Sequence, residues 1–270
     1  MTNGSSQGLF VIVAVVIFGI FVLISYVLFR NELKPTLANI FTDGLEQAEE
    51  NLTGIVKEKP INIQSSREDE NYLYAKIRDA NEAKNETEIW VQAKKLDDGT
   101  LELDKSSISD GNYTSGYSDM TGSLAIPDTI NGKKITLIKE KAFFNARFTG
   151  SLTLPKYLQS IGRSAFEGSK FSGSLTLPDE MASIEDAAFY YSNFTGSLTL
   201  PNNLSSIKGT AFYYSNFTGT LDISNIGYIG NFAFGKSSIS TVKNDSLDNN
   251  NKTIGKEAIR MSNGSYYSVK

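Results

Sequence analysis

The residues best suited to chemistry in this 270-residue chain are two pairs of adjacent tyrosines, which lie 23 residues apart. Tyrosine combines a large ring with a polar hydroxyl, and exposed tyrosines are favoured contact residues at binding interfaces. We therefore predict a partner-contact surface made of Tyr190, Tyr191, Tyr213 and Tyr214. The alternative is that these rings stack between neighbouring repeats and only stabilise the fold.

Catalytic residues are scarce in this sequence. The chain has no histidine and no cysteine, which removes the commonest general base near neutral pH, the thiol nucleophile and thiolate metal ligands. No acidic position recurs in every repeat. We therefore expect a protein that is not an enzyme, with no catalytic residues, no cofactor and no metal site. The net charge of −4 gives no basic field for nucleic acid, which is not an expected partner.

A repeated string of residues must position the tyrosines. Phe-Thr-Gly-Ser-Leu-Thr-Leu-Pro occurs at residues 148–155 and 194–201, with variants at 171–178 and 217–224. An isoleucine and an Ala-Phe pair follow in each of the first five units, at steps of 23 residues and, in the last step, 22. The sixth unit is degenerate and has Ala258-Ile259 in place of Ala-Phe. A fixed period in this range predicts a solenoid, in which each coil is stable only against its neighbours. Residues 120–261 then hold six coils, the first of which is enlarged by five residues around 131–134.

Alternation within the string predicts one strand per coil. In Gly150–Pro155, Leu152 and Leu154 point to one side and Ser151 and Thr153 to the other. The leucines must face the core, and the proline ends the strand because it has no N–H to donate. The outward serines and threonines form a second exposed ladder. This ladder suits solvent, although contact with carbohydrate or peptide is the alternative.

The repeats resemble a known family. The stretch Ile126–Phe143, with Ile-Pro, Asn-Gly, Ile-Lys-Glu and Ala-Phe in order, is similar to the BspA-type leucine-rich repeat, and the resemblance covers residues 120–261. It implies a leucine-rich solenoid, without enzymatic activity, of the kind often found on the surface of bacteria or protists, where adhesion or protein binding is the usual role. The family often carries cysteine a few residues after Ala-Phe, where this chain has Ser169, Ser192 and Ser215.

The sequence of residues 1–54 predicts a membrane anchor. After a short tail at 1–8, residues 9–29 are apolar and uncharged, which is long enough for a transmembrane helix. Apolar residues at three- and four-residue steps then predict an amphipathic helix over 30–54. Arg30 and Lys34 follow the span and weakly favour a cytoplasmic location for the rest of the chain. Long domains can nevertheless be exported regardless of flanking charge.

Residues 55–119 predict a small β region and linker. Strands are expected at 72–77, 88–96 and 101–104, and the Asp-Asp-Gly-Thr at 97–100 predicts a hairpin turn between the last two. The only tryptophan, Trp90, is predicted to lie in the core. Residues 262–270 are expected to form a polar tail.

The complete prediction is therefore a mainly β fold. A short leucine-rich-repeat solenoid of about six 23-residue coils is preceded by a transmembrane helix and a small β region. The predicted function is a single-pass cell-membrane protein whose extracellular repeats bind an unknown protein or glycan for adhesion. The alternative is a pilin-like structural subunit of a surface assembly, decorated by the solenoid, which self-associates through its N-terminal helix.

Overall fold

The structure is a computed structural model, and it describes residues 65–245 and 252–268. Within this part of the chain no helix has the length and apolarity needed to cross a membrane. The one helical element described there is a short 3-10 turn, η2 (Glu82–Lys84), and the rest consists of strands, turns and loops.

Three of the sequence predictions lie outside the described residues. They are the tail at 1–8, the transmembrane helix at 9–29 and the amphipathic helix at 30–54. These elements remain predictions from the sequence.

The described residues form 20 strands, most of them short. In chain order they are β1 (Ser66–Glu68), β2 (Tyr72–Arg78), β3 (Ile89–Lys95), β4 (Leu101–Ser107), β5 (Thr121–Ala125), β6 (Thr129–Ile130), β7 (Lys133–Ile138), β8 (Arg147–Thr153), β9 (Ser160–Ile161), β10 (Ser172–Gly173), β11 (Ser183–Ile184), β12 (Asn193–Gly196), β13 (Ser206–Ile207), β14 (Asn216–Phe217), β15 (Thr220–Asp222), β16 (Tyr228–Ile229), β17 (Phe234–Ile239), β18 (Thr241–Lys243), β19 (Thr253–Ile254) and β20 (Ile259–Met261).

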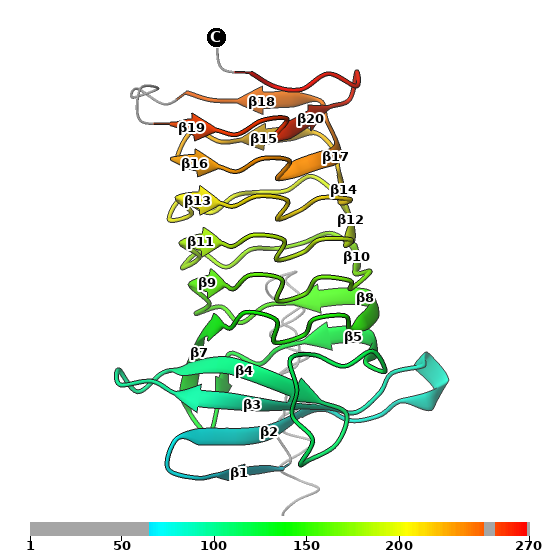
Figure 1. Cartoon of the computed structure of the whole chain (residues 1–270), viewed down its shortest axis with the longest axis vertical. Coiled ribbons are helices and arrows are strands. Elements are labelled where there is room, and N and C mark those ends of the chain that lie inside the picture. Colours follow the sequence, from blue (N-terminus) through cyan, green and yellow to red (C-terminus); the bar gives the residue numbers. More distant parts are fainter. Residues whose placement is uncertain (1–64, 246–251, 269–270) are drawn as a thin grey trace, which may run out of the picture. The chain divides into compact units, whose positions relative to one another are not determined.

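One ladder of strands runs through the described residues. Its order is β1-β2-β3-β4-β7-β9-β11-β13-β16-β19, and Figure 1 shows β7 to β19 following one another along one side in chain order. From β7 onward each coil contributes a pair of residues that ends in isoleucine, in register with the isoleucine of the next coil. The repeating coils predicted from the 23-residue period are therefore confirmed.

The predicted strand in the repeated string forms in only some coils. β8 and β15 include the leucine-containing segment, whereas β10 and β12 end before it at Gly173 and Gly196. The inward direction of the leucines is nevertheless confirmed, since Leu152, Leu175 and Leu198 are at most 6% exposed. The strand prediction fails in the middle coils because the ladder that joins every coil runs through the isoleucine segment instead.

Two columns of phenylalanine rings fill the core. The rings that follow alanine stack with centroids 5.2–5.3 Å apart, and those that open the repeated string stack at 5.2–6.2 Å. The columns also meet each other edge to face. All of these rings are fully buried: Phe143, Phe166, Phe189, Phe212 and Phe234 in the first column, and Phe148, Phe171, Phe194 and Phe217 in the second.

A column of small residues lies beside the rings. Ser169, Ser192, Ser215 and Ser237 are completely buried, at the position where the first coil has Ala146. The hydroxyls of Ser215 and Ser237 donate to the carbonyl of the serine one coil earlier, at 3.5 and 3.2 Å. The site therefore accepts a small side chain, as the sequence predicts.

The extra residues of the first coil form a hairpin. β6 and β7 pair antiparallel around Asn131 and Gly132, whose φ angles are 50° and 74°. Two successive residues with positive φ are typical of a tight hairpin turn, and asparagine followed by glycine favours it. The insertion thus leaves the stacking of the coil unchanged.

An antiparallel sheet precedes the coils. β1 to β4 pair in chain order, and the predicted turn at 97–100 joins β3 to β4. The N–H of Thr100 donates to the carboxylate of Asp98 at 2.9 Å, and Gly99 has a φ of 82°. These hydrogen bonds from Thr100 lower the pKa of Asp98, so the aspartate stabilises the turn.

This sheet continues directly into the solenoid. β4 pairs parallel with β7, so that the N-terminal sheet covers the first coil. Beside this junction Asp104 is 5% exposed, and it accepts a hydrogen bond from the Lys139 ammonium at 2.6 Å. The same hydrogen bond raises the pKa of Lys139. The end of the coil stack is therefore paired rather than left as an open edge.

We expect Phe189→Ala to lower the free energy of unfolding by about 3–5 kcal/mol, because Phe189 stacks on rings in both neighbouring coils. Denaturant unfolding of the full chain in detergent measures this loss. Phe144→Ala is the matched control, since Phe144 is only partly buried, and it should lose much less. Equal losses in the two variants would show that the stacked column does not dominate stability.

Candidate functional site

The predicted tyrosines lie together in the turn that follows Ala-Phe. The rings of Tyr190 and Tyr213 stack with centroids 5.6 Å apart, and those of Tyr191 and Tyr214 stack at 4.7 Å. Tyr190 also meets Tyr191 edge to face at 4.5 Å. We call these four residues the tyrosine ladder. Its outer pair is the exposed part, with 46% exposure at Tyr191 and 37% at Tyr214.

The backbone of the outer pair is unusual for tyrosine. Tyr191 and Tyr214 have φ angles of 72° and 75°, in the left-handed region. The equivalent residues of the two preceding coils are Asn145 and Gly168, with φ angles of 57° and 88°. Asparagine and glycine enter this region readily, whereas a bulky side chain there costs on the order of 1–3 kcal/mol. Two coils thus carry tyrosine where the backbone favours asparagine or glycine.

Hydrogen bonds between coils fix this backbone conformation. The N–H of Asn145 donates to the carbonyl of Glu167 at 2.7 Å, that of Gly168 to Tyr190 at 3.0 Å, and that of Tyr191 to Tyr213 at 3.1 Å. The turn is therefore the same whether the residue is asparagine, glycine or tyrosine. It follows that the choice of tyrosine is not dictated by the turn.

Glycines mark both ends of the tyrosine ladder. Gly168 precedes Tyr191 in its column, and Gly235 follows Tyr213 in the other. A Cβ atom on Gly235 would lie 2.5 Å from the ring of Tyr213, so that only glycine leaves room for this ring. Beyond the ladder, the ammonium of Lys236 lies 6.0 Å from the centroid of the Tyr214 ring.

Within the inner pair of the ladder, Tyr190 has a perturbed electrostatic environment. Burial, followed by a hydrogen bond with Tyr191, raises the pKa of Tyr190 to about 12. The folded protein therefore favours the neutral phenol at this position more strongly than water does.

The outward serines and threonines of the repeated string lie where the sequence predicts. Ser151, Ser174, Ser197 and Thr220 are exposed, and the neighbouring row of Thr153, Thr176 and Thr199 is interrupted at Asp222. Hydrogen bonds from Ser224 and then from Lys243 lower the pKa of Asp222 to about 2. The Asp222 carboxylate is therefore already occupied by contacts within its own chain.

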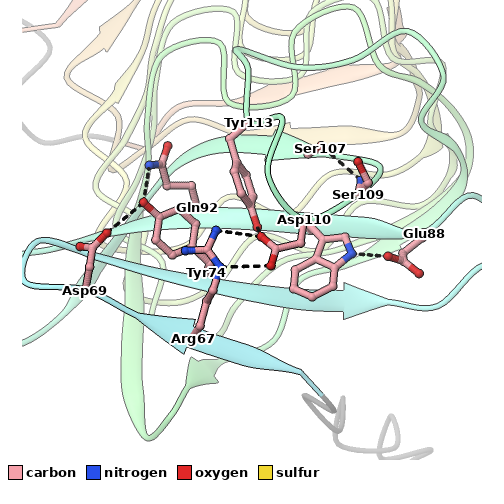
Figure 2. A network of polar contacts seen from close by, with 10 residues as sticks. Arg67, Asp69, Tyr74, Glu88, Gln92, Ser107, Ser109, Asp110 and Tyr113 are labelled. Atoms are coloured by element: carbon pink, nitrogen blue, oxygen red, sulfur yellow. Dashed lines mark hydrogen bonds and ion pairs between the residues drawn. The ribbon is translucent and has the colours of Figure 1, made fainter.

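Sequence reasoning missed a polar cluster on the N-terminal sheet, which Figure 2 shows. The guanidinium of Arg67 donates to both carboxylate oxygens of Asp110 at 3.1 and 2.9 Å, and lies 3.8 Å from the centroid of the Tyr74 ring. The hydroxyl of Tyr113 donates to the same carboxylate at 2.9 Å. The hydrogen bond between Arg67 and Asp110 lowers the pKa of the Asp110 carboxyl. These groups satisfy one another and tie a loop to the sheet, which indicates a structural role.

The prediction that Trp90 lies in the core is wrong. Ile89 and Val91 are buried, whereas Trp90 is half-buried on the opposite face of β3, and its indole N–H donates to the carboxylate of Glu88. The physical reason is the alternation of side chains along a strand. If Ile89 and Val91 are assigned to the buried face of the strand, the alternation predicts that Trp90 lies on the opposite face.

No group of three acidic residues, histidines or cysteines that could hold a metal ion occurs in residues 65–245 and 252–268.

The geometry defines a class of protein. Short parallel strands stacked one per coil, with leucine, isoleucine and phenylalanine directed inward, form a leucine-rich solenoid. Residues 132–265 match the family model of the BspA type leucine rich repeat region, in six copies. This part of the chain is therefore a BspA-type leucine-rich repeat region, as the resemblance indicates. Neither the curated proteins nor the solved structures gave a match.

We expect the protein to lose stability between pH 10 and 12, because Tyr190 has a raised pKa of about 12 against an ordinary value of 10.0. Its contribution is fully present below pH 10 and disappears as the pH rises through the folded pKa. Thermal unfolding of the full chain and of Tyr190→Phe across this range measures the effect. The variant should lose less stability than the parent, and parallel losses would contradict the assignment.

Proposed function

We propose that this chain is a single-pass cell-membrane protein that displays its repeats outside the cell to bind a protein or a glycan. A BspA-type solenoid suggests a surface-binding repeat protein. The apolar run at 9–29 supports the anchor, because its length suits a membrane-spanning helix. The amphipathic stretch at 30–54 could in addition pack against the same stretch of a second copy.

The tyrosine ladder is the proposed contact surface. The observation that carries this proposal is that the stacked rings of Tyr191 and Tyr214 stay 46% and 37% exposed, on a left-handed backbone. Tyr191 and Tyr214 make four ring contacts in the ladder. At about 0.5–1.5 kcal/mol each, these contacts are of the same size as the backbone cost of about 1–3 kcal/mol at each of the two positions. Stability alone therefore gives little reason to keep tyrosine there. Contact with a partner does give a reason, because tyrosine contributes strongly to binding energy.

The proposal predicts that Tyr191→Asn combined with Tyr214→Asn weakens adhesion roughly tenfold or more. Asparagine is the residue of the equivalent turn at Asn145 and suits its backbone. Retention of cells that display the full chain on mucin-coated plates measures the effect. Tyr228→Asn is the matched control, since Tyr228 is 39% exposed but outside the ladder. An equal loss of adhesion in Tyr228→Asn and in the double variant would contradict the assignment of the contact surface to the ladder. Unchanged adhesion in both would contradict it as well.

The topology is tested separately. Trypsin added to intact cells should release fragments of residues 65–268, because lysines and arginines are exposed along the repeats. A cytoplasmic marker protein should stay intact in the same sample. Repeats that trypsin reaches only after the membrane is opened would place them inside the cell and contradict surface display.

A further inference from the structure

A hollow of about 450 Å³ lies in the coils that precede the tyrosine ladder. This volume is within the range of pockets that hold small ligands. The hollow is lined by Ser118, Asn145, Arg147, Thr149, Gly168 and Lys170.

The hollow lies at the position where the next two coils carry tyrosine. Gly168 is the equivalent of Tyr191 and Tyr214, and it has no side chain to occupy this space. Its N–H donates to the carbonyl of Tyr190 at 3.0 Å, so that the coil of Gly168 is directly adjacent to the first coil of the ladder. The hollow and the ladder thus form successive sections of one surface.

Two positive charges stand side by side at the hollow. Arg147 and Lys170 are exposed and hold equivalent positions in neighbouring coils, whose backbones are joined by the bond from the Lys170 N–H to the Phe148 carbonyl at 2.8 Å. Neighbouring strands are about 4.8 Å apart, and like charges at this spacing repel. Neither side chain forms an ion pair or hydrogen bond with another residue in the described part of the chain, although the whole protein has a net charge of −4.

Neutral polar groups complete the lining. Asn145 and Thr149, whose side chains carry an amide and a hydroxyl, also line the hollow. Each can donate and accept hydrogen bonds, as sugar hydroxyls require. The two cations suit a carboxylate, which accepts charge-assisted hydrogen bonds from arginine and lysine.

We propose that this hollow binds a carboxylate-bearing sugar of an acidic glycan. The inference rests on the proposed function and specifies its ligand class: the acidic sugar lies between Arg147 and Lys170, and the next sugar of the chain lies over Tyr191. An acidic peptide would also satisfy the cations. The glycan fits better, because the neutral lining groups match sugar hydroxyls and the tyrosine edge offers an apolar surface to the C–H groups of a sugar ring.

Titration of the full chain in detergent with a hyaluronan hexasaccharide, which carries carboxylates, tests the inference. Chitohexaose serves as the neutral sugar and poly-glutamate as the acidic peptide. We expect the hexasaccharide to bind roughly tenfold tighter than chitohexaose, and Arg147→Gln with Lys170→Gln to remove this preference. The matched control is Lys94→Gln with Lys105→Gln, which removes the same charge from residues outside the hollow.

A second variant blocks the hollow without changing its charge. Gly168→Tyr reproduces the sequence of the next two coils, where tyrosine adopts the same left-handed backbone, and it should abolish binding of the hexasaccharide. Equal binding of the acidic and neutral sugars, binding that survives loss of both cations, or tighter binding of poly-glutamate than of the hexasaccharide would each overturn the inference.

The outcome is separable from that of the adhesion test. Adhesion that requires the tyrosine ladder while the hexasaccharide does not bind would overturn this inference alone. Hexasaccharide binding that requires Arg147 and Lys170 supports the inference, and adhesion that ignores the ladder would then overturn only the assignment of the ladder.

Discussion

Register between coils is the constraint on which the whole structure depends. Each coil returns its isoleucine to pair with the isoleucine of the coil before it. Once that pairing is fixed, every other residue of the coil lies above its counterpart. Two unbroken phenylalanine columns and one buried serine column follow from this constraint. The extra residues of the first coil are tolerated because the β6–β7 hairpin carries them outside the stack.

The same constraint determines how the surface can vary. Hydrogen bonds between coils hold the turn after Ala-Phe in one conformation, so that its side chains change while its backbone does not. Along one column this turn presents Asn145, Gly168, Tyr191 and Tyr214. The glycine leaves a hollow and the tyrosines form a ladder. A binding surface thus arises from substitutions at one turn position, without any change in the fold.

The sequence predicts the structural features that arise from its repeats and from alternating side chains. The period identifies the coils, alternation directs the leucines inward, and Asp97–Thr100 predicts the hairpin, because all of these signals are local. The pairing of β4 with β7 is not predictable in this way, since it joins distant residues. The strand segment in the middle coils is misplaced for a related reason: the sequence does not reveal which part of a coil carries the continuous ladder.

The candidate site likewise has features that the sequence predicts and features that it does not. The tyrosines are visible in the sequence as two spaced pairs, and their stacking follows from the period. The left-handed backbone beneath them is not visible there, because it depends on hydrogen bonds to the next coil. The hollow is harder still to predict, since it results from the absence of a side chain at Gly168.

The central claim is that tyrosine occupies the turn for contact and not for stability. The free energy of unfolding of Tyr214→Gly, measured in denaturant on the full chain, tests it most directly. The account predicts a value within about 1 kcal/mol of that of the parent. Glycine relieves a left-handed backbone strain of about 1–3 kcal/mol, and it removes three ring contacts of about 0.5–1.5 kcal/mol each. A loss of more than about 1 kcal/mol, the scale of one aromatic stacking contact, would show that the ladder serves the fold and would contradict the claim.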